Sequence, residues 1–308
     1  MLIKAPRGLI IFPGALGDLI CVLPAVHVLA QRYPKVGFEL MAREELAHFA
    51  VQRMEIVAGH SIDRREVALL FSEHGGESIM ARQFFSQFAR IHSFFASDND
   101  SFCSSLRQAA QGRVCIYPFR PAGLVHVAES YLRVVGAEPS EPLDSSLELM
   151  QEDLRSAERR LGGLGLEQKN FVLLLPGSGT PRKNWPAENF VQLSQRIQLR
   201  YPVLVVLGPA EQGLMPVFHR GSLSVTNDAE LGELAAIARL ARCFVGNDSG
   251  VSHLAAAAGA RGLTIFGPTD PNRWRPLGDV RTIRSELLES LSPDSVWPAV
   301  EELIHTES

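Results

Sequence analysis

Short apolar runs alternate along the chain with longer segments whose apolar residues recur at helical spacing. The run "GLIIF" at residues 8–12, for example, is rich in β-branched side chains and predicts a buried strand. Further strands are predicted at residues 36–42, 89–97 and 113–119 and in "NFVLLL", "VLVVL", "SLSVT", "CFVGN", "GLTIF" and "RTIRS". This alternation of strand and helix is typical of parallel sheets covered by helices on both faces, and so it predicts the α/β class.

A proline- and serine-rich segment at residues 138–149 divides the pattern into two blocks. We therefore predict one domain over residues 1–150 and a second over residues 151–290, each with its own core. A last helix, within residues 291–308, is predicted to pack back toward the first domain. Residues 61–76 are expected to form a loop region. The length of 308 residues is sufficient for two such domains.

Composition excludes several classes of protein. The formal net charge of -4 gives no global basic field, so nucleic acid is not an expected partner. The four cysteines are far apart, which argues against a disulfide framework or structural zinc and favours a reducing compartment. Pro13, Gly14, Gly17 and Asp18 interrupt the apolar N-terminal stretch, which argues against a signal peptide. No uninterrupted apolar stretch of about 18 residues predicts a transmembrane helix.

The turn "FPGALGDLI" follows the first predicted strand. Because ligands of open α/β sheets bind at the carboxyl ends of the strands, this turn is a candidate site. Gly14 and Gly17 allow a tight turn and a close backbone approach to a ligand. Asp18, at the start of the next helix, has two interpretations: an N-cap, or a general base that faces a cleft. The spacing does not match the G-x-G-x-x-G fingerprint of dinucleotide binding.

Two loops of the second half combine small, polar and charged residues. In "PGSGTPRKNWP", Ser178, Gly179, Thr180 and Lys183 bring donors and positive charge together, as a diphosphate requires. The alternative is a solvated surface loop, and the Walker A pattern is absent. In "GPAEQG", Glu211 is placed either to accept hydrogen bonds from a ribose diol or to serve as a charge at a helix start.

The motif "GNDSGVSH" lies between a predicted strand and an alanine-rich helix. Asp248, Ser249 and Gly250 precede the helix, whose free N–H groups favour a phosphate, and His253 lies one turn inside it. The D-x-D of "SDND" at residues 97–100 could hold a divalent metal, but its place at a predicted helix start favours capping. We therefore predict no metal site.

Together these motifs resemble glycosyltransferase family 9, the lipopolysaccharide heptosyltransferases. The resemblance covers most of the chain and is carried by "GALGDLICVLPAV", "PGSGTPRKNWPAENF" and "VGNDSGVSHLAAAAGARGLTIFGPTDPNRWRP". It implies the GT-B architecture, in which two Rossmann-like, doubly wound domains face each other across a cleft. It also implies inverting, metal-independent transfer of a sugar, typically heptose from ADP-heptose, to a lipopolysaccharide core or related glycan, with no cofactor.

The resemblance also implies roles for single residues. Asp18 matches the family's general base, Ser178 and Lys183 its phosphate loop, and Glu211 its ribose-binding acid. The block from Asp248 to His253 matches the family's donor site. On charge and rough position alone, three arginines are candidates for acceptor binding: Arg64, Arg82 and Arg120. Because the family's acceptor is a membrane glycolipid, a cytoplasmic protein in transient contact with the inner face of the inner membrane is expected.

Other functions remain as alternatives. One is a GT-B enzyme that uses a different sugar donor, or an epimerase that changes a nucleotide-sugar without an acceptor. Another is a non-catalytic nucleotide-binding protein, against which the intact Asp18, Lys183, Asp248 and His253 argue. A Rossmann dehydrogenase is disfavoured by the missing glycine fingerprint.

Overall fold

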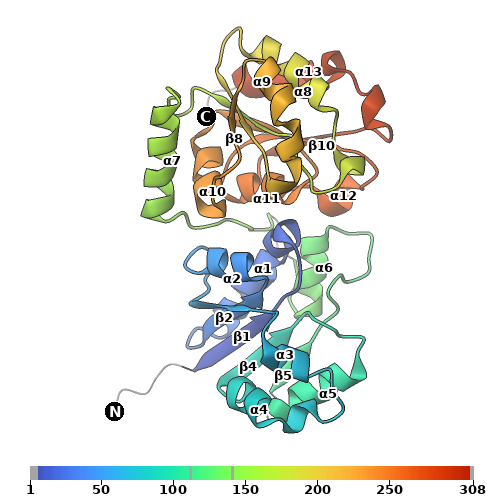
Figure 1. Cartoon of the computed structure of the whole chain (residues 1–308). Coiled ribbons are helices and arrows are strands. Elements are labelled where there is room, and N and C mark those ends of the chain that lie inside the picture. The colour runs from blue at the N-terminus through green and yellow to red at the C-terminus, as the bar shows by residue number, and fades with distance from the viewer. Residues whose placement is uncertain (1–5, 111–112, 140–141, 306–308) are drawn as a thin grey trace. The chain divides into compact units, whose positions relative to one another are not determined.

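The computed structural model of the chain describes residues 6–110, 113–139 and 142–305. It divides into two compact units, Met1–Leu143 and Asp144–Ser308, each built on a parallel sheet with helices between its strands (Figure 1). The α/β fold with two domains is therefore confirmed. The division falls within the segment expected to link the domains, of which residues 140–141 lie outside the described part.

The sheet of the first unit has the strand order β3-β2-β1-β4-β5. Its strands are β1 (Arg7–Ile11), β2 (Gly37–Ala42), β3 (Ala58–Ser61), β4 (Phe88–Ser93) and β5 (Val114–Ile116). Its α-helices are α1 (Leu16–Arg32), α2 (Glu44–Ala50), α3 (Arg65–Leu69), α4 (Ile79–Phe85), α5 (Asp100–Ala109) and α6 (Val127–Val134).

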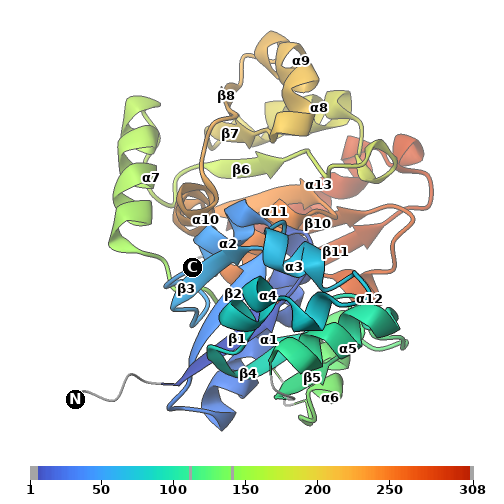
Figure 2. The same ribbon diagram turned by 60° about the horizontal axis from the view of Figure 1, so that its bottom comes forward.

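Both faces of this sheet are covered, because successive residues of a strand point to opposite sides. On one face Leu9 and Ile11 of β1 share a core with Phe85 of α4 and with Phe102 and Leu106 of α5. On the other face α1 and α6 lie side by side (Figures 1 and 2). Burial on both faces explains why residues 8–12 form an unbroken apolar run.

The strand β3 and the helix α3 were not expected from the sequence. Residues 61–76 were expected to form a loop, but they include α3 and a short 3-10 helix at Gly75–Glu77. The sequence of β3, "AGHS", has no apolar alternation, yet it pairs in parallel with β2 from Ala58 to Ser61. Its His60 lies 2.6 Å from the buried carboxylate of Glu39 in β2. Backbone pairing and this polar contact thus form a strand that hydrophobic periodicity does not reveal.

The sheet of the second unit has the order β11-β10-β9-β6-β7-β8. Its strands are β6 (Val172–Leu175), β7 (Val203–Val206), β8 (Ser224–Thr226), β9 (Cys243–Asn247), β10 (Gly262–Phe266) and β11 (Val280–Arg284). Its α-helices are α7 (Gln151–Gly163), α8 (Ala187–Ile197), α9 (Met215–Arg220), α10 (Leu231–Leu240), α11 (Gly250–Ala257), α12 (Pro271–Trp274) and α13 (Pro293–His305).

The last helix belongs to the second unit rather than forming a separate element. Val296 and Val300 of α13 are fully buried in the same core as Phe190 of α8 and Phe218 of α9. The helix contacts α8, β9 and β10. The expected boundary at residue 290 is therefore wrong, because the apolar face of α13 completes this core. Residues 306–308 lie outside the described part.

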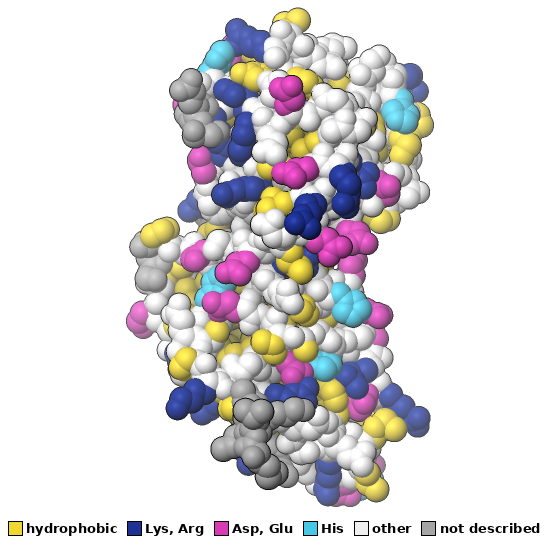
Figure 3. Space-filling model, turned by 90° about the vertical axis from the view of Figure 1, so that its left-hand side faces the viewer, with side chains coloured by type: hydrophobic (Ala, Val, Ile, Leu, Met, Phe, Trp, Pro, Cys, Tyr) yellow, Lys and Arg dark blue, Asp and Glu magenta, His cyan; other side chains and the backbone are white. Residues whose placement is uncertain are grey.

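Charges of both signs cover the surface. On the face that Figure 3 shows, Lys and Arg side chains are interspersed with Asp and Glu rather than gathered in one large patch. In the second unit, Arg160 of α7 binds Asp228 and Glu233 at 2.7 Å each. Within the described residues, no helix is both long enough and apolar enough to cross a membrane.

The strand order reverses once in each sheet. In the first unit the chain runs outward from β1 through β2 to β3 and then returns to place β4 on the other side of β1. In the second unit the chain runs outward from β6 through β7 to β8 and then returns to place β9 on the other side of β6. Such switch points open a crevice at the carboxyl ends of the two central strands, where ligands of these folds bind. The glycine turn follows β1, and the two polar motifs of the second half follow β6 and β9.

Candidate functional site

Asp18 lies in the first turn of α1, directly after the tight turn that leads from β1 into that helix. A side chain at Gly14 would place its Cβ 2.5 Å from the Phe12 ring and 2.7 Å from the Asp18 Cβ, so only glycine fits there. Gly17 is half-buried in the first turn of α1. Asp18 is the third residue of the helix rather than its N-cap, and its buried carboxylate accepts a hydrogen bond from the Ala15 N–H at 3.3 Å. Asp18 therefore satisfies one free N–H group at the helix start, and this bond uses only one of the lone pairs of its carboxylate.

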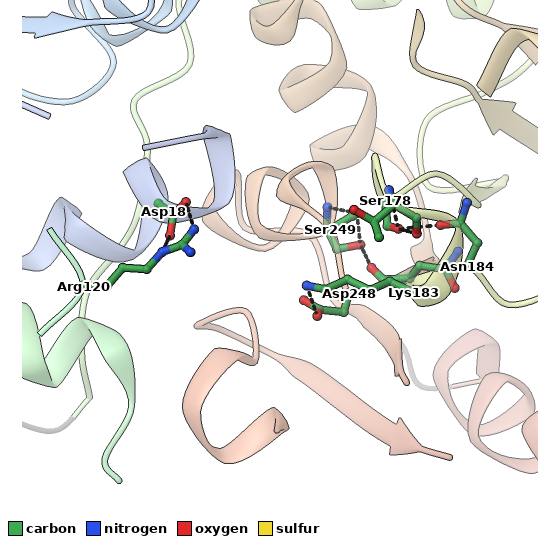
Figure 4. Close-up of polar contacts among 10 residues, drawn as sticks. Asp18, Arg120, Ser178, Lys183, Asn184, Asp248 and Ser249 are labelled. Carbon is green, nitrogen blue, oxygen red and sulfur yellow. Dashed lines mark hydrogen bonds and ion pairs between the residues drawn. The ribbon is translucent and has the colours of Figure 1, made fainter. Parts of the chain in front are cut away.

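The carboxylate of Asp18 is also paired with Arg120, which follows β5 (Figure 4). Arg120 Nε lies 3.3 Å from Oδ1 and Arg120 Nη2 lies 3.1 Å from Oδ2, so the contact is bidentate. The hydrogen bond with Asp18 raises the pKa of Arg120. The Asp18 side chain is 8% exposed, whereas that of Arg120 is 58% exposed. A buried anion is thus covered by a cation that reaches solvent.

The other two candidate arginines have different contacts. Arg64 binds Glu66 at 2.9 Å through Nη2, and its guanidinium stacks 3.9 Å from the centroid of the Phe84 ring. Arg82 donates from Nε to the Gly76 carbonyl at 3.0 Å. Of the three predicted acceptor-binding arginines, Arg120 is therefore the one that the fold brings to Asp18.

The loop after β6 folds back on itself (Figure 4). The Ser178 hydroxyl lies 2.5 Å from Asn184 Oδ1 and 2.9 Å from the Thr180 carbonyl, and the Thr180 N–H lies 3.4 Å from Ser178 Oγ. Gly179 has a φ of +69°, a left-handed conformation that favours glycine. These contacts preorganise residues 176–186, which we call the β6 loop.

Glu211, which follows β7, is brought to the β6 loop. Its buried carboxylate accepts a hydrogen bond from the Gly179 N–H at 3.1 Å. A Cβ at Gly177 would lie 2.6 Å from the Glu211 carboxyl carbon, and one at Gly208 would lie 2.7 Å from Oε2. Glu211 therefore packs closely against two glycines and holds the β6 loop. Neither predicted role of Glu211, ribose binding or a charge at a helix start, included this contact.

Lys183 of the β6 loop forms an ion pair with Asp248, which follows β9. The distance from Lys183 Nζ to Asp248 Oδ2 is 2.7 Å (Figure 4). The Asp248 side chain is 5% exposed and that of Lys183 is 34% exposed. The Asp248 N–H also donates to the Ile265 carbonyl at 2.9 Å. The aspartate is thus fixed by β10, and it holds the lysine at the switch point of the sheet.

Ser249 is the N-cap of α11, a role that was not predicted from the sequence. Its hydroxyl accepts from the Ser252 N–H at 3.3 Å, and its carbonyl accepts from the buried His253 N–H at 3.2 Å. A Cβ at Gly246 would lie 2.7 Å from Ser252 Oγ, so β9 and α11 approach closely. Gly250 is the first residue of α11, whose N-terminus favours an anion at this point.

Asn247 was not identified from the sequence, although it joins the parts of this site. Its fully buried side chain donates from Nδ2 to the Pro176 carbonyl at 2.6 Å and accepts the Trp185 N–H at Oδ1 at 3.0 Å. Pro176 and Trp185 lie at the two ends of the β6 loop. A polar amide at the end of the apolar strand "CFVGN" was the available signal, because a buried amide requires hydrogen-bond partners.

The "SDND" motif caps a helix, as expected. Asn99 is the N-cap of α5, and its Oδ1 accepts from the Phe102 N–H at 2.8 Å. Across the part of the chain that the structure describes, there is no group of three or more His, Cys, Asp or Glu side chains that could hold a metal ion.

A protein-family model and a named relative both match this chain, and both are heptosyltransferases. The family model of glycosyltransferase family 9 (heptosyltransferase) matches residues 123–304. Lipopolysaccharide heptosyltransferase 3 of Escherichia coli strain K12 is 22% identical over 292 residues, which cover 84% of this chain and 82% of that protein.

Two solved structures are similar over almost the whole chain. The glycosyl transferase family 9 protein of Veillonella parvula has a TM-score of 0.81 at 20% identity, covering 99% of this chain and 98% of that one. The E. coli heptosyltransferase WaaC, solved with ADP-2-deoxy-2-fluoro heptose, has a TM-score of 0.68 at 20% identity and covers 96% and 99%. At 20% identity, these similarities show a shared fold.

Proposed function

Because the chain belongs to glycosyltransferase family 9, we propose that it transfers heptose from ADP-heptose to a lipopolysaccharide core, with inversion and without a metal. The matching relative from E. coli is a lipopolysaccharide heptosyltransferase, and the WaaC structure contains an ADP-heptose analogue. The observation that supports this function most strongly is the convergence of Lys183, Ser249 and the α11 N-terminus at the switch point of the second sheet.

In the proposed donor complex, the diphosphate binds between the β6 loop and α11. Lys183 supplies the positive charge, while Ser178, Ser249 and the backbone N–H groups at Gly250 supply hydrogen-bond donors. Gly179 and Thr180 shape the β6 loop, and Asp248 and His253 line the site. The Glu211 carboxylate accepts hydrogen bonds from the ribose hydroxyls. Because these groups are held before the donor arrives, they stabilise the charge that develops on the leaving diphosphate.

In the proposed reaction, Asp18 is the general base. The acceptor hydroxyl oxygen forms a bond to the anomeric carbon on the face opposite the diphosphate, whose own bond to that carbon breaks. The hydroxyl proton moves to the Asp18 carboxylate, and the electron pair of the broken bond leaves on the diphosphate. The buried position of Asp18 at the carboxyl end of β1 supports this role, since a positioned base contributes about 10²–10⁴-fold to the rate.

We assign acceptor binding to Arg120 rather than to Arg64 or Arg82. Its side chain is more than half exposed, and it already binds a carboxylate in bidentate geometry. A phosphate or carboxylate of the acceptor offers the same geometry. An acceptor anion that takes over the guanidinium would free Asp18 at the moment when a base is needed.

We further propose transient contact with the cytoplasmic face of the inner membrane through the first unit. Three large apolar side chains on α4 or shortly after α3 are exposed: Phe71 is 43%, Met80 39% and Ile79 75% exposed. The exposed Arg65 of α3 would meet anionic headgroups. The four cysteines are free thiols, which suits the reducing compartment of this proposal.

The decisive experiment incubates the purified protein with ADP-heptose and a heptose-deficient lipopolysaccharide core, in parallel with UDP- and GDP-sugars. We expect ADP release that depends on the acceptor, an acceptor heavier by one heptose, and an inverted anomeric configuration by NMR. Activity should persist after dialysis against EDTA.

Each alternative gives a different result in the same assay. A change in the nucleotide-sugar without an acceptor would identify an epimerase. Transfer from a UDP- or GDP-sugar alone would identify another donor. Saturable ADP binding without turnover under any of these conditions would identify a non-catalytic nucleotide-binding protein and would contradict the proposal.

A further inference from the structure

A cavity lies at the edge of the first sheet, away from the first turn of α1, which contains Asp18. It has a volume of about 300 Å³ and is lined by residues 89–92 of β4 together with residues 113–115 in and just before β5. Arg113 precedes β5, whereas Arg120 follows it, so this cavity and the Asp18–Arg120 pair lie at different ends of the strand. The proposed transfer reaction makes no use of it.

Two arginines face each other across this strand pair. Because Ile91 pairs with Val114 and His92 with Cys115, the preceding residues Arg90 and Arg113 lie opposite one another on the same face. The two positive charges repel each other. The Arg90 guanidinium stacks 4.0 Å from the centroid of the Tyr33 ring, and among the described residues neither arginine is paired with a carboxylate.

His92 also lines the cavity, but its ring is buried and its Nε2 is closed to solvent. His92 is 2% exposed, and its Nδ1 lies 3.0 Å from the Tyr117 hydroxyl, whereas Nε2 has no hydrogen-bond partner in the described structure. Burial, followed by the charges of Arg90 and Arg32, lowers the pKa of His92 to about 4, so the imidazole is neutral at pH 7. When Tyr117 donates to Nδ1, the ring hydrogen lies on Nε2, the nitrogen without a partner.

We propose that this cavity binds a phosphate group, held by the guanidiniums of Arg90 and Arg113. The two charged side chains of the lining, Arg90 and Arg113, are cations, and none of the described residues that line the cavity carries a carboxylate. The cavity therefore favours an anion over a cation. Two planar guanidiniums offer several hydrogen-bond donors, which suits a tetrahedral oxyanion. The anion would also offset the repulsion between the two arginines.

Cys115 provides a local reporter of this binding. Of the four cysteines it is the exposed one, and it lies opposite His92 across the strand pair. The rate at which neutral N-ethylmaleimide labels the folded protein should therefore fall in a saturable manner as inorganic phosphate is added. The side-chain Nε2–H signal of His92 in NMR should shift over the same concentration range.

Substitution of one arginine should remove the effect without unfolding the protein, because both arginines are exposed. We expect Arg113→Gln or Arg90→Gln to weaken phosphate binding by about tenfold or more. In phosphate-free buffer the Arg113→Gln variant should melt no lower than the parent, since a like-charge contact is removed. Arg107→Gln, which removes an exposed cation of α5, is the matched control and should leave the protection intact.

The source of the phosphate group is distinguished by a second arm with vesicles of phosphatidylglycerol. Protection of Cys115 by inorganic phosphate identifies a soluble ligand, and protection by vesicles alone identifies a lipid headgroup. The Lys183→Ala variant should retain the effect in either arm, which separates this cavity from the donor site and its test from the proposed transfer reaction. Unchanged labelling in both arms, or protection that survives both arginine substitutions, would overturn the proposal.

Discussion

The guanidinium of Arg120 forms two hydrogen bonds, of 3.1 and 3.3 Å, with the carboxylate of Asp18, although 102 residues separate them in the chain. The pair joins the loop after β5 to the first turn of α1, and its anion is buried while its cation reaches solvent. Arg120 contacts both carboxylate oxygens of Asp18, and the Ala15 N–H also donates to Oδ2. This relationship makes the roles of the two residues separately testable.

Asp18→Asn should reduce turnover by about 10²–10⁴-fold, because an amide cannot accept the acceptor proton. The amide oxygen keeps the contact with the Ala15 N–H, so the fold of the turn should persist. Calorimetry with ADP should give an unchanged affinity, since Asp18 lies outside the donor-binding unit. Turnover equal to that of the parent protein would show that the base is another group.

Arg120→Gln should raise the KM for the acceptor by about tenfold, through loss of a charge-assisted bidentate contact, and should leave ADP affinity unchanged. Arg82→Gln is the matched variant, because Arg82 is also an exposed arginine of the first unit but binds the Gly76 carbonyl. Steady-state kinetics with varied acceptor compares the two. If the KM for the acceptor rises for Arg82→Gln and not for Arg120→Gln, acceptor binding belongs to Arg82 instead.

Lys183→Met should abolish tight binding of ADP and also lower the free energy of unfolding. The substitution leaves the buried Asp248 carboxylate without its cation, a loss of about 1–2 kcal/mol given that a third of the lysine is exposed. The double variant Lys183→Met/Asp248→Asn should recover most of that stability but none of the ADP affinity. Urea denaturation and calorimetry separate the two effects, and recovery of binding in the double variant would exclude Lys183 as a phosphate ligand.

Asn247→Ala should release the β6 loop. The variant leaves the Pro176 carbonyl and the Trp185 N–H without their shared partner, which costs about 1–3 kcal/mol for each buried group. ADP affinity should fall because Ser178 and Lys183 are then no longer held in place. Thr264→Val on the neighbouring β10 is the control, since the buried Thr264 Oγ1 has no partner within the described residues. Equal ADP affinities in the two variants would argue against the positioning role.

Acidification should destabilise the first unit through His92. Its pKa falls from 6.5 in the unfolded chain to about 4 in the fold, so below pH 6.5 the unfolded state binds a proton that the folded state does not. The stability contribution is full above pH 6.5, and about 2 kcal/mol is lost between pH 7 and pH 5. Urea denaturation at both pH values should show this loss, and His92→Gln should reduce it. A pH dependence equal in the parent and the variant would assign the loss to another group.

The fold class was predictable because burial on both faces of a parallel sheet produces continuous apolar runs, as in β1 and β6. The positions of the polar motifs were also predictable, since Ser178, Asp248 and Asp18 each follow such a run. Strand β3 was not, because "AGHS" is stabilised by pairing with β2 and by the His60–Glu39 contact rather than by apolar periodicity. The helix α13 was assigned outside the second domain because its amphipathic pattern does not say which core it completes.

The sequence by itself thus determined the alternation of strands and helices, the two blocks and the polar residues at the strand ends, because these depend on neighbours in the chain. Only the tertiary structure decided which strand ends meet. The order β10-β9-β6-β7 places Asp248 beside Lys183 and lets Asn247 bind both ends of the β6 loop. Partners separated by 62 to 102 residues are brought together by strand pairing and core packing, which local periodicity does not encode.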